Sequence, residues 1–352
     1  MSFAERLIAW QHQHGRHHLP WQCSDPYRIW LSEIMLQQTQ VSTVIPYFER
    51  FVERFPTVVD LANAPQEAVL EAWAGLGYYA RARNLHRCAQ TIAGEFGGHF
   101  PNTAASLETL PGIGRSTAAA IAAFGFGERA AILDGNVRRV LCRHFAVDGF
   151  PGEAATLAKL WALAENLLPP AKDIRPYTQG LMDLGSMVCT RGKPACEECP
   201  LHTSCLAFKQ GRTHELPTPK PRKTIPQREV AFLFLHHANS WLFERRPQRG
   251  IWGGLLAPIT LAEHHLESSE TEGKLDESLL ALGLCRLDTK AASVFSHTFS
   301  HFQLHIQPWI CEVSILNPDA HSLVTVAEEH LSSAALPAPI KKFLRELHNP
   351  QH

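Results

Sequence analysis

Four cysteines in the middle third of the chain lie close enough together for their sulfur atoms to share one ligand. Their spacing is C-x6-C-x2-C-x5-C, at Cys189, Cys196, Cys199 and Cys205. Four thiolates in one short loop bind either a tetrahedral metal ion or an iron–sulfur cluster. Structural zinc modules usually contain two C-x2-C pairs, and this loop contains one, so the spacing favours a cluster with a structural or redox-sensing role.

A glycine-rich hairpin precedes this loop and suits phosphate binding. The stretch from Leu110 reads LPGIGRSTA, in which Gly112 and Gly114 allow a tight turn. Arg115 and Ser116 then begin a predicted helix, whose amide donors and dipole favour an anion such as a DNA phosphate. A purely structural helix–turn–helix remains an alternative.

Two carboxyl groups could carry acid and base chemistry. Glu33 is the only acid among the apolar residues of WLSEIMLQQTQV (Trp30–Val41), on a predicted helix, and Asp134 opens LDGNVRRVLCR. Desolvation raises the pKa of a carboxyl, whereas a helix N-terminus favours the anion. Glu33 is therefore expected to be an acid and Asp134 an anion, a combination that suits cleavage of a glycosidic bond.

Each carboxyl also has a structural alternative. Glu33 could lie on a solvated helix face or pair with Arg28, and Asp134 could be an ordinary helix N-cap. Spacing alone leaves these alternatives open.

The elements that must position these groups are helices up to about residue 211. Apolar residues recur with a period near 3.6. The periodicity predicts helices over Ser42–Arg54, Gln66–Trp73, Tyr78–Phe96, Ser116–Phe124, Val137–Phe145, Ala154–Leu168 and Pro176–Val188.

A proline-rich segment separates this region from a second domain. Thr213–Gln227 contains four prolines and little to bury, which predicts an extended linker. We expect an all-α domain over residues 1–211, a linker over 212–228 and an α+β domain over 229–352. The α+β prediction rests on strands at Val230–Leu235, Trp241–Glu244 and Phe302–Ile306, and on helices at Leu275–Leu282 and Ile340–Leu347.

The composition fits a protein of the cytoplasm. The chain has 352 residues, of which 45% are hydrophobic, and nowhere do eighteen apolar residues run together. Nine cysteines, four of them clustered, indicate metal ligands plus buried thiols in a reducing compartment.

The charge is distributed unevenly along the chain. The net charge of −1 divides into +3 for residues 1–225 (23 Lys/Arg, 20 Asp/Glu) and −4 for the remainder (10 Lys/Arg, 14 Asp/Glu). A DNA-binding surface must therefore be local.

Several motifs together resemble a known family. They are WLSEIMLQQTQV, GLGYYARARNL, LPGIGRSTA, LDGNVRRVLCR, the cysteine loop, WGGL (Trp252–Leu255) and HTFSH (His297–His301). The chain resembles the helix-hairpin-helix DNA glycosylases of the endonuclease III superfamily, and within it the MutY-type adenine DNA glycosylases. The resemblance covers nearly the whole chain and implies a [4Fe-4S] cluster on the four cysteines.

The resemblance also implies roles at the reacting base. Glu33 would protonate N7 of an extruded adenine, and Asp134 would stabilise the oxocarbenium-like sugar or bond to it transiently. Asn136 and Gln179 match hydrogen-bonding residues of the base pocket. Related enzymes that also nick the strand carry lysine where this chain has Ser116, so a monofunctional glycosylase is expected.

Further residues match the family's DNA contacts. Gln38 and Tyr78 correspond to residues that wedge into the duplex beside the lesion, although without the resemblance core packing would be the favoured interpretation of Tyr78. Arg81 and Arg83 fit either a phosphate-facing surface or a solvated basic face.

The C-terminal region resembles the Nudix-like module of this family. It lacks the clustered glutamates in R-E-x-x-E-E order that a Nudix pyrophosphatase needs as Mg²⁺ ligands, so a binding role is expected. The resemblance maps recognition of 8-oxoguanine onto Phe299, Ser300 and His301, where a hydroxyl can accept from N7–H, a proton that guanine lacks. A polar turn before a strand is the structural alternative.

The sequence thus predicts a monomeric bacterial enzyme near the nucleoid, acting on double-stranded DNA with an adenine·8-oxoguanine or adenine·guanine mispair. Contacts with other repair proteins are expected near the linker. Two alternatives remain: an endonuclease III-like glycosylase and lyase for oxidised pyrimidines, and a non-catalytic iron–sulfur DNA-binding protein. Ser116 and the second domain argue against the first alternative.

Overall fold

The computed structural model describes residues 1–221, 225–247, 250–261, 269–299, 301–320 and 322–348. Contacts divide the chain into two units, which are considered separately. The first comprises Met1–Pro65 and Arg81–Arg222, and the second comprises Gln66–Ala80 and Lys223–His352.

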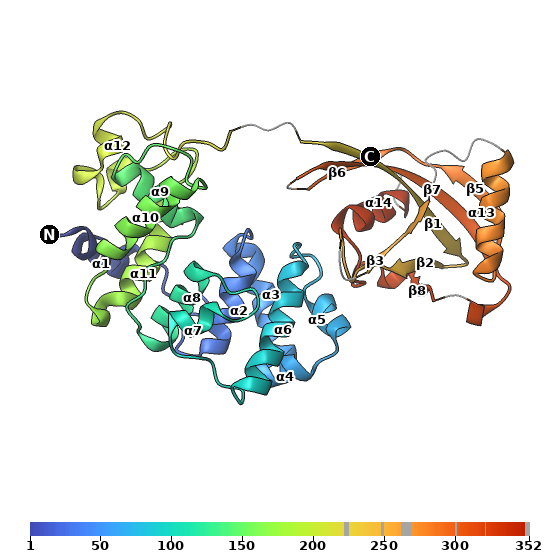
Figure 1. The fold of residues 1–352 in the computed structure, drawn as a ribbon, viewed down its shortest axis with the longest axis horizontal. Helices are drawn as coiled ribbons and strands as arrows, with labels where there is room; N and C mark the ends of the chain where they lie inside the picture. The colour runs from blue at the N-terminus through green and yellow to red at the C-terminus, as the bar shows by residue number, and fades with distance from the viewer. Residues whose placement is uncertain (222–224, 248–249, 262–268, 300, 321, 349–352) are drawn as a thin grey trace. The chain divides into compact units, whose positions relative to one another are not determined.

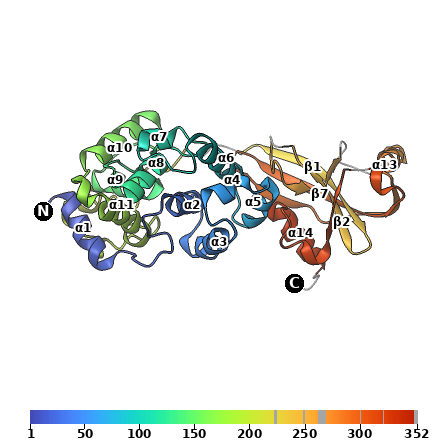
Figure 2. The ribbon, with the colours of Figure 1, turned by 90° about the horizontal axis from the view of Figure 1, so that it is seen from below.

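The first unit is helical (Figures 1 and 2). Its α-helices are α1 (Phe3–His14), α2 (Pro26–Leu36), α3 (Val41–Arg54), α4 (Val58–Asn63), α6 (Ala80–Glu95), α7 (Ala104–Glu108), α8 (Arg115–Ile121), α9 (Gly135–His144), α10 (Ala154–Asn166), α11 (Ile174–Asp183) and α12 (Leu206–Lys209). Helix α5 (Gln66–Ala72) belongs to the second unit. The helices predicted up to residue 211 are confirmed, and each of them begins within two residues of its predicted start. Within the described residues, no helix combines the length and apolar character that a membrane crossing needs.

Helix α2, which carries Glu33, begins at a strong capping signal and ends early. Asp25 accepts a hydrogen bond from the Tyr27 amide at 3.0 Å, and Pro26 occupies the first helical turn. The helix stops at Leu36, and the polar residues that follow form a turn in which Gln38 has a φ of 60°.

One core lies beneath the predicted functional residues of the helical unit. Leu7 of α1, Val137 of α9, Leu160 of α10 and Leu184 after α11 are fully buried and belong to one cluster. Two π-helical turns, Ala122–Phe126 after α8 and Leu184–Val188 after α11, continue the preceding helices. The cysteine loop therefore starts from a helix anchored in the core.

The second unit contains a mixed sheet. Its strands are β1 (Gln227–His237), β2 (Ser240–Arg245), β3 (Leu256–Ala257), β4 (Ile259–Leu261), β5 (Leu284–Ala291), β6 (Phe295–Thr298), β7 (Gln303–Ile315) and β8 (Val324–Ala327). The main order is β3-β2-β1-β7-β5, with β4 on β1, β6 on β7 and β8 on β2. Strands β1 and β7 are parallel, and every other pair is antiparallel.

Helices cover both faces of this sheet (Figures 1 and 2). Along β1, Phe232 and Phe234 pack with α14 (Ala338–His348), whereas Leu233 and Leu235 pack with α13 (Ser269–Ala281). Alternate strand residues point to opposite faces, so the continuous apolar run of β1 matches its burial on both sides. The predicted α+β class of this region is confirmed.

Candidate active site

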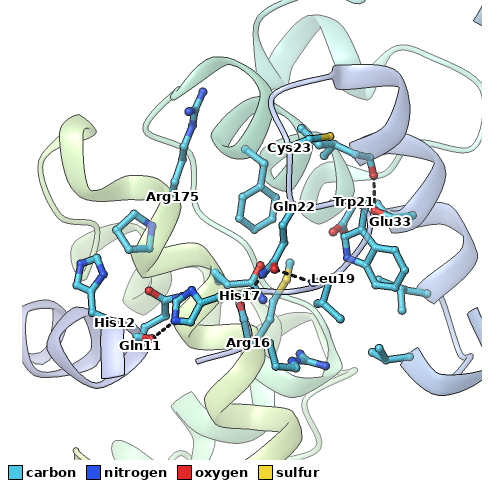
Figure 3. A pocket seen from close by; sticks show the side chains of 18 residues that line it. Gln11, His12, Arg16, His17, Leu19, Trp21, Gln22, Cys23, Glu33 and Arg175 are labelled. Atoms are coloured by element: carbon cyan, nitrogen blue, oxygen red, sulfur yellow. Dashed lines mark hydrogen bonds between the residues drawn. The ribbon is translucent and has the colours of Figure 1, made fainter. Parts of the chain in front are cut away.

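A cavity of about 350 Å³ opens in the helical unit between α1, α2 and α11. Figure 3 shows its lining, to which α2 contributes Glu33 and α11 contributes Arg175. Trp21 and Phe124 supply apolar wall, and Gln179 supplies a polar group. Its volume and its mixture of apolar wall with a few polar groups suit a small planar ligand.

Glu33 is held in this wall by the apolar residues beside it on α2. Trp30 and Ile34 are buried, while the Glu33 side chain is half-buried against the cavity. Burial, and secondarily the charge of Asp134, raises the pKa of Glu33 from 4.5 to about 8. The alternative partner Arg28 lies 3.7 Å from Asp25 instead. Glu33 therefore carries its proton at neutral pH.

Asp134 caps helix α9. Its carboxylate accepts a hydrogen bond from the Val137 amide at 2.8 Å, as expected for an N-cap. Burial nevertheless raises its pKa, although backbone donors and Arg139 act in the opposite direction. Desolvation is the largest of these effects on the pKa of Asp134, and the donors at the helix N-terminus oppose it.

A buried ion pair in the cavity wall was not predicted from the sequence. The fully buried carboxylate of Asp183 pairs with Arg16 at 2.6 Å and accepts the Arg16 amide at 2.9 Å. Gln179 donates to the same carboxylate at 3.0 Å, which fixes its amide. Asp183 could have been found in the sequence by the pattern that marked Glu33, a lone acid in an apolar helix. Its partner Arg16 could not, because it lies 167 residues away in the chain.

Asn136 does not line the cavity and instead faces the cysteine loop. Arg139 donates to Asn136 Oδ1 at 2.8 Å, to the Gly185 carbonyl at 2.7 Å and to the Cys189 carbonyl at 2.7 Å. A Cβ on Gly185 would come within 2.6 Å of the Asn136 Cβ. The beginning of α9 is thus fastened to the start of the cysteine loop.

The four cysteines line one small cavity of about 30 Å³. Buried Arg143 donates to Cys189 Sγ at 3.4 Å and to the Leu216 carbonyl at 2.9 Å. From α1, Arg6 holds the other side of the loop through Thr203 and Ser204, at 2.9 and 2.7 Å. Contacts from two separate helices, α1 and α9, therefore hold the loop.

The predicted phosphate hairpin joins α7 to α8. Gly112 has a φ of 79°, and a Cβ there would lie 2.7 Å from the Asn84 Cβ, so both turn geometry and packing require glycine. Gly114 is the N-cap of α8. The Arg115 side chain is occupied within the protein, stacked 3.8 Å over Trp161 and paired with Glu165.

Ser116, in the first turn of α8, makes a hydrogen bond within the protein. Its hydroxyl accepts the Leu133 amide at 2.9 Å, immediately before Asp134 in the chain. The hairpin helix thus supports the loop that carries the second carboxyl.

The two predicted wedge residues share an unusual backbone conformation. Gln38 and Tyr78 have φ values of 60° and 49°. Tyr78 is 58% exposed, which rules out the alternative of core packing. Arg81 was expected either to face a phosphate or to be solvated. Its guanidinium instead donates hydrogen bonds to backbone carbonyls at the end of α2.

Two of the predicted lesion-reading residues, Phe299 and His301, lie at the β6–β7 turn of the second unit. The Phe299 amide donates to the Phe302 carbonyl at 2.8 Å, and the Phe299 ring packs 5.7 Å from Trp252, in the WGGL motif. His301 lies in the same turn, 6.3 Å from the Phe299 ring. Ser300 lies outside the described residues. The WGGL and HTFSH motifs therefore meet.

The chain matches two family models. Residues 31–166 match the HhH-GPD superfamily of base excision DNA repair proteins, and residues 230–346 match the NUDIX domain. A solved structure of a thermostable thymine-DNA glycosylase shares 29% identity at a TM-score of 0.54, over 59% of this chain and 95% of that one. A non-covalent endonuclease III–DNA complex, 20% identical with a TM-score of 0.51, shares the fold over 59% of this chain and 94% of that one.

Curated relatives extend the likeness to the whole chain. The adenine DNA glycosylase of Buchnera aphidicola subsp. Schizaphis graminum is 35% identical over 348 residues, which cover 97% of each chain. The human adenine DNA glycosylase is 42% identical over 225 residues, covering 61% of this chain and 41% of the human protein. On this similarity along nearly its full length, the chain belongs to the adenine DNA glycosylase family.

Proposed function

We propose that this protein is a monofunctional adenine DNA glycosylase of base excision repair, acting on adenine opposite 8-oxoguanine or guanine in duplex DNA. The observation that carries the proposal is Glu33, a carboxyl with a pKa raised to about 8 in the wall of a cavity of about 350 Å³. Such a group can donate a proton at neutral pH to a base held in the cavity.

The chemistry begins with proton transfer from Glu33 to N7 of the extruded adenine. The C1′–N9 bond then breaks, its electrons remain on the base, and adenine leaves as a neutral molecule. Gln179 and Arg16, held by Asp183, supply donors that orient the base. General acid catalysis of this kind is worth about 10²–10⁴-fold.

Asp134 is proposed to stabilise the positive charge that develops on the sugar. Its carboxylate stabilises the oxocarbenium-like centre, and the nearby Arg138 and Arg139 favour the anionic form. A water molecule then adds to C1′ and loses a proton, leaving an abasic site.

DNA binding brings the base to the cavity. The backbone amides at Gly112 and Gly114 fit a phosphate, and the exposed Gln38 fills the space that the extruded base leaves. Tyr78 of the second unit is proposed as a further wedge residue, on the strength of its own exposure. Because Arg115 is paired with Glu165, the hairpin backbone carries this contact.

The cysteine loop suits a [4Fe-4S] cluster held by Cys189, Cys196, Cys199 and Cys205. Burial raises the pKa of the Cys199 thiol to about 12, and the neighbouring cysteines oppose each other's ionisation, so four thiolates require a bound cationic centre. The single C-x2-C pair in the loop supports an iron–sulfur cluster over zinc, because structural zinc modules usually contain two such pairs. When bound, the cluster supplies four iron–sulfur bonds that close the loop.

The second unit is proposed to recognise 8-oxoguanine. Among the acids of α13 whose side chains are described, Asp276 is bound by Arg286 at 2.6 and 2.9 Å, so this carboxylate is not free for a catalytic Mg²⁺. The second unit is therefore proposed to bind 8-oxoguanine through Phe299, Ser300 and His301, and not to hydrolyse a pyrophosphate.

Replacing both Ser300 and His301 with alanine is expected to reduce the preference for adenine opposite 8-oxoguanine over adenine opposite guanine by about tenfold. Losing a hydrogen bond to a buried polar group costs about 1–3 kcal/mol, and 1.4 kcal/mol corresponds to a factor of ten. The measurement is the ratio of single-turnover rates on the two duplexes. Ser296 and His305 form a hydrogen-bonded pair at 2.8 Å on β6 and β7, so Ser296→Ala with His305→Ala is the matched control. An unchanged ratio in the first variant excludes this assignment.

The wild-type protein is expected to release adenine without cutting the strand. Ser116 provides no amine for a Schiff base, and its hydroxyl already accepts the Leu133 amide. Duplexes with adenine opposite 8-oxoguanine are incubated with the protein and quenched with or without hot alkali. Strand breaks that appear only after alkali support the proposal, and breaks at the rate of base release contradict it. A duplex with an oxidised pyrimidine, cleaved faster than the adenine substrate, indicates an endonuclease III-like enzyme instead.

A further inference from the structure

Arg81, at the start of α6, binds the end of the neighbouring helix α2. Its Nη1 donates to the carbonyl oxygens of Ile34 and Met35 at 3.0 and 2.9 Å and to that of Gln37. Its Nη2 donates to Thr39 Oγ1 at 3.2 Å. The carbonyls in the last turn of a helix lack intrahelical partners, and a cation there is favoured by the helix dipole. A single side chain therefore clamps the end of α2 and the turn that follows it.

This turn holds Gln38 in a conformation that a glutamine rarely adopts. Gln38 has a φ of 60°, and left-handed backbone is unfavourable for a residue with a Cβ, which approaches the following carbonyl oxygen. Such a conformation persists only where surrounding contacts impose it. Within the turn, the Thr39 amide donates to the Leu36 carbonyl at 3.2 Å, and Arg81 grips the residues on both sides of Gln38. The result is an exposed Gln38 on a fixed backbone.

Helix α6, which carries Arg81, also packs against the phosphate hairpin. Asn84, one turn after Arg81, lies against Gly112, where an added Cβ would be only 2.7 Å away. A cavity of about 30 Å³ between them is lined by Gln37, Arg81, Asn84 and Gly112. Helix α6 therefore sets the separation between the hairpin and the turn that carries Gln38.

We propose that Arg81 is a positioning residue, which locks the Gln37–Thr39 turn so that Gln38 enters the duplex in register with a phosphate held by the hairpin. This inference rests on the proposed function, because it concerns the step in which adenine is extruded. Arg81 acts through Gln38, whereas Glu33 and Asp134 act on the extruded nucleotide.

The first test replaces Arg81 with glutamine and measures base extrusion and base release separately. With 2-aminopurine in place of adenine, fluorescence reports extrusion in the bound duplex. We expect Arg81→Gln to reduce the fluorescence rise at least threefold and the single-turnover rate of adenine release at least tenfold, and Arg81→Lys to recover part of both. Arg129→Gln is the matched control, because Arg129 also caps backbone carbonyls, those of Leu168 and Pro169, away from this turn. Values for Arg81→Gln equal to those of Arg129→Gln overturn the proposal.

A double variant separates positioning from general stability. If Arg81 acts through Gln38, then Arg81→Gln slows the Gln38→Ala enzyme by less than twofold, because the side chain to be positioned is already gone. Independent losses that multiply in the double variant overturn the proposal.

Hydrogen exchange of the turn tests the proposal without catalysis. We expect the Thr39 amide to exchange at least tenfold faster in Arg81→Gln than in Arg129→Gln, at the same melting temperature. Unchanged exchange overturns the positioning role. Failure of the wild-type protein to release adenine from any mispair instead refutes the proposed function, and the exchange result still decides the role of Arg81.

Discussion

Glu33→Gln is expected to reduce the single-turnover rate of adenine release by about 10²–10⁴-fold while leaving DNA binding within a few-fold of wild type. The amide matches the carboxyl in size and fits the same half-buried position on α2, but it carries no acidic proton. The effect therefore falls on the bond-breaking step and not on formation of the complex.

The measurement uses excess enzyme on a duplex with adenine opposite 8-oxoguanine, quenched with hot alkali over time, beside a binding titration. Glu49→Gln is the matched control, because Glu49 is an exposed glutamate on α3. A Glu33→Gln enzyme that retains the wild-type rate rules out Glu33 as the acid. A variant that fails to bind DNA instead points to a structural role for Glu33.

The pH dependence of this rate follows from the raised pKa of Glu33. The acid is needed in its protonated form, so the wild-type rate should fall about tenfold per pH unit above about pH 8. Because the folded-state pKa lies above 4.5, protonation of Glu33 also favours folding, and this contribution is lost as pH rises through about 8. Glu33→Gln should remove both dependences, and an alkaline limb that persists in the variant must come from another group.

Local signals in the sequence accounted for much of the fold and for Glu33. The helices were recognisable from a 3.6-residue period, and Glu33 was recognisable as one acid inside an apolar helical stretch. The same signal marks Asp183 on α11, where the buried carboxylate orders Gln179. A systematic search for lone acids in apolar helices would have found it.

Local sequence patterns could not predict which residues pair over long distances in the chain, or which of two opposing effects on a pKa is larger. Arg16 and Arg81 look like surface cations in the sequence, and only the fold brings them to Asp183 and to the end of α2. For Asp134 the sequence revealed the helix N-terminus, which lowers a pKa, but not the burial that outweighs it. Desolvation depends on residues from several elements and therefore requires the folded structure.

Asp134→Asn is expected to slow adenine release on the order of 10²–10³-fold, the loss typical of removing one preorganised electrostatic contact to a developing charge. The substitution removes only the charge, because asparagine is as good an N-cap as aspartate and its amide oxygen can still accept the Val137 amide. Stability should therefore remain close to wild type, whereas Asp134→Ala should lose about 0.5–2 kcal/mol with the cap.

The acid side of the pH profile distinguishes this role from capping. Burial raises the pKa of Asp134 above 3.8, so the anion is lost as pH falls through that raised value, and the wild-type rate should show an acid limb there. Asp134→Asn should abolish this limb and leave the alkaline limb of Glu33. Asp25→Asn makes the same exchange at the N-cap of α2, where the carboxylate accepts the Tyr27 amide at 3.0 Å, and should preserve both limbs and the rate. If Asp134→Asn is no slower than Asp25→Asn, Asp134 is only a helix cap, and charge stabilisation at the sugar must come from elsewhere.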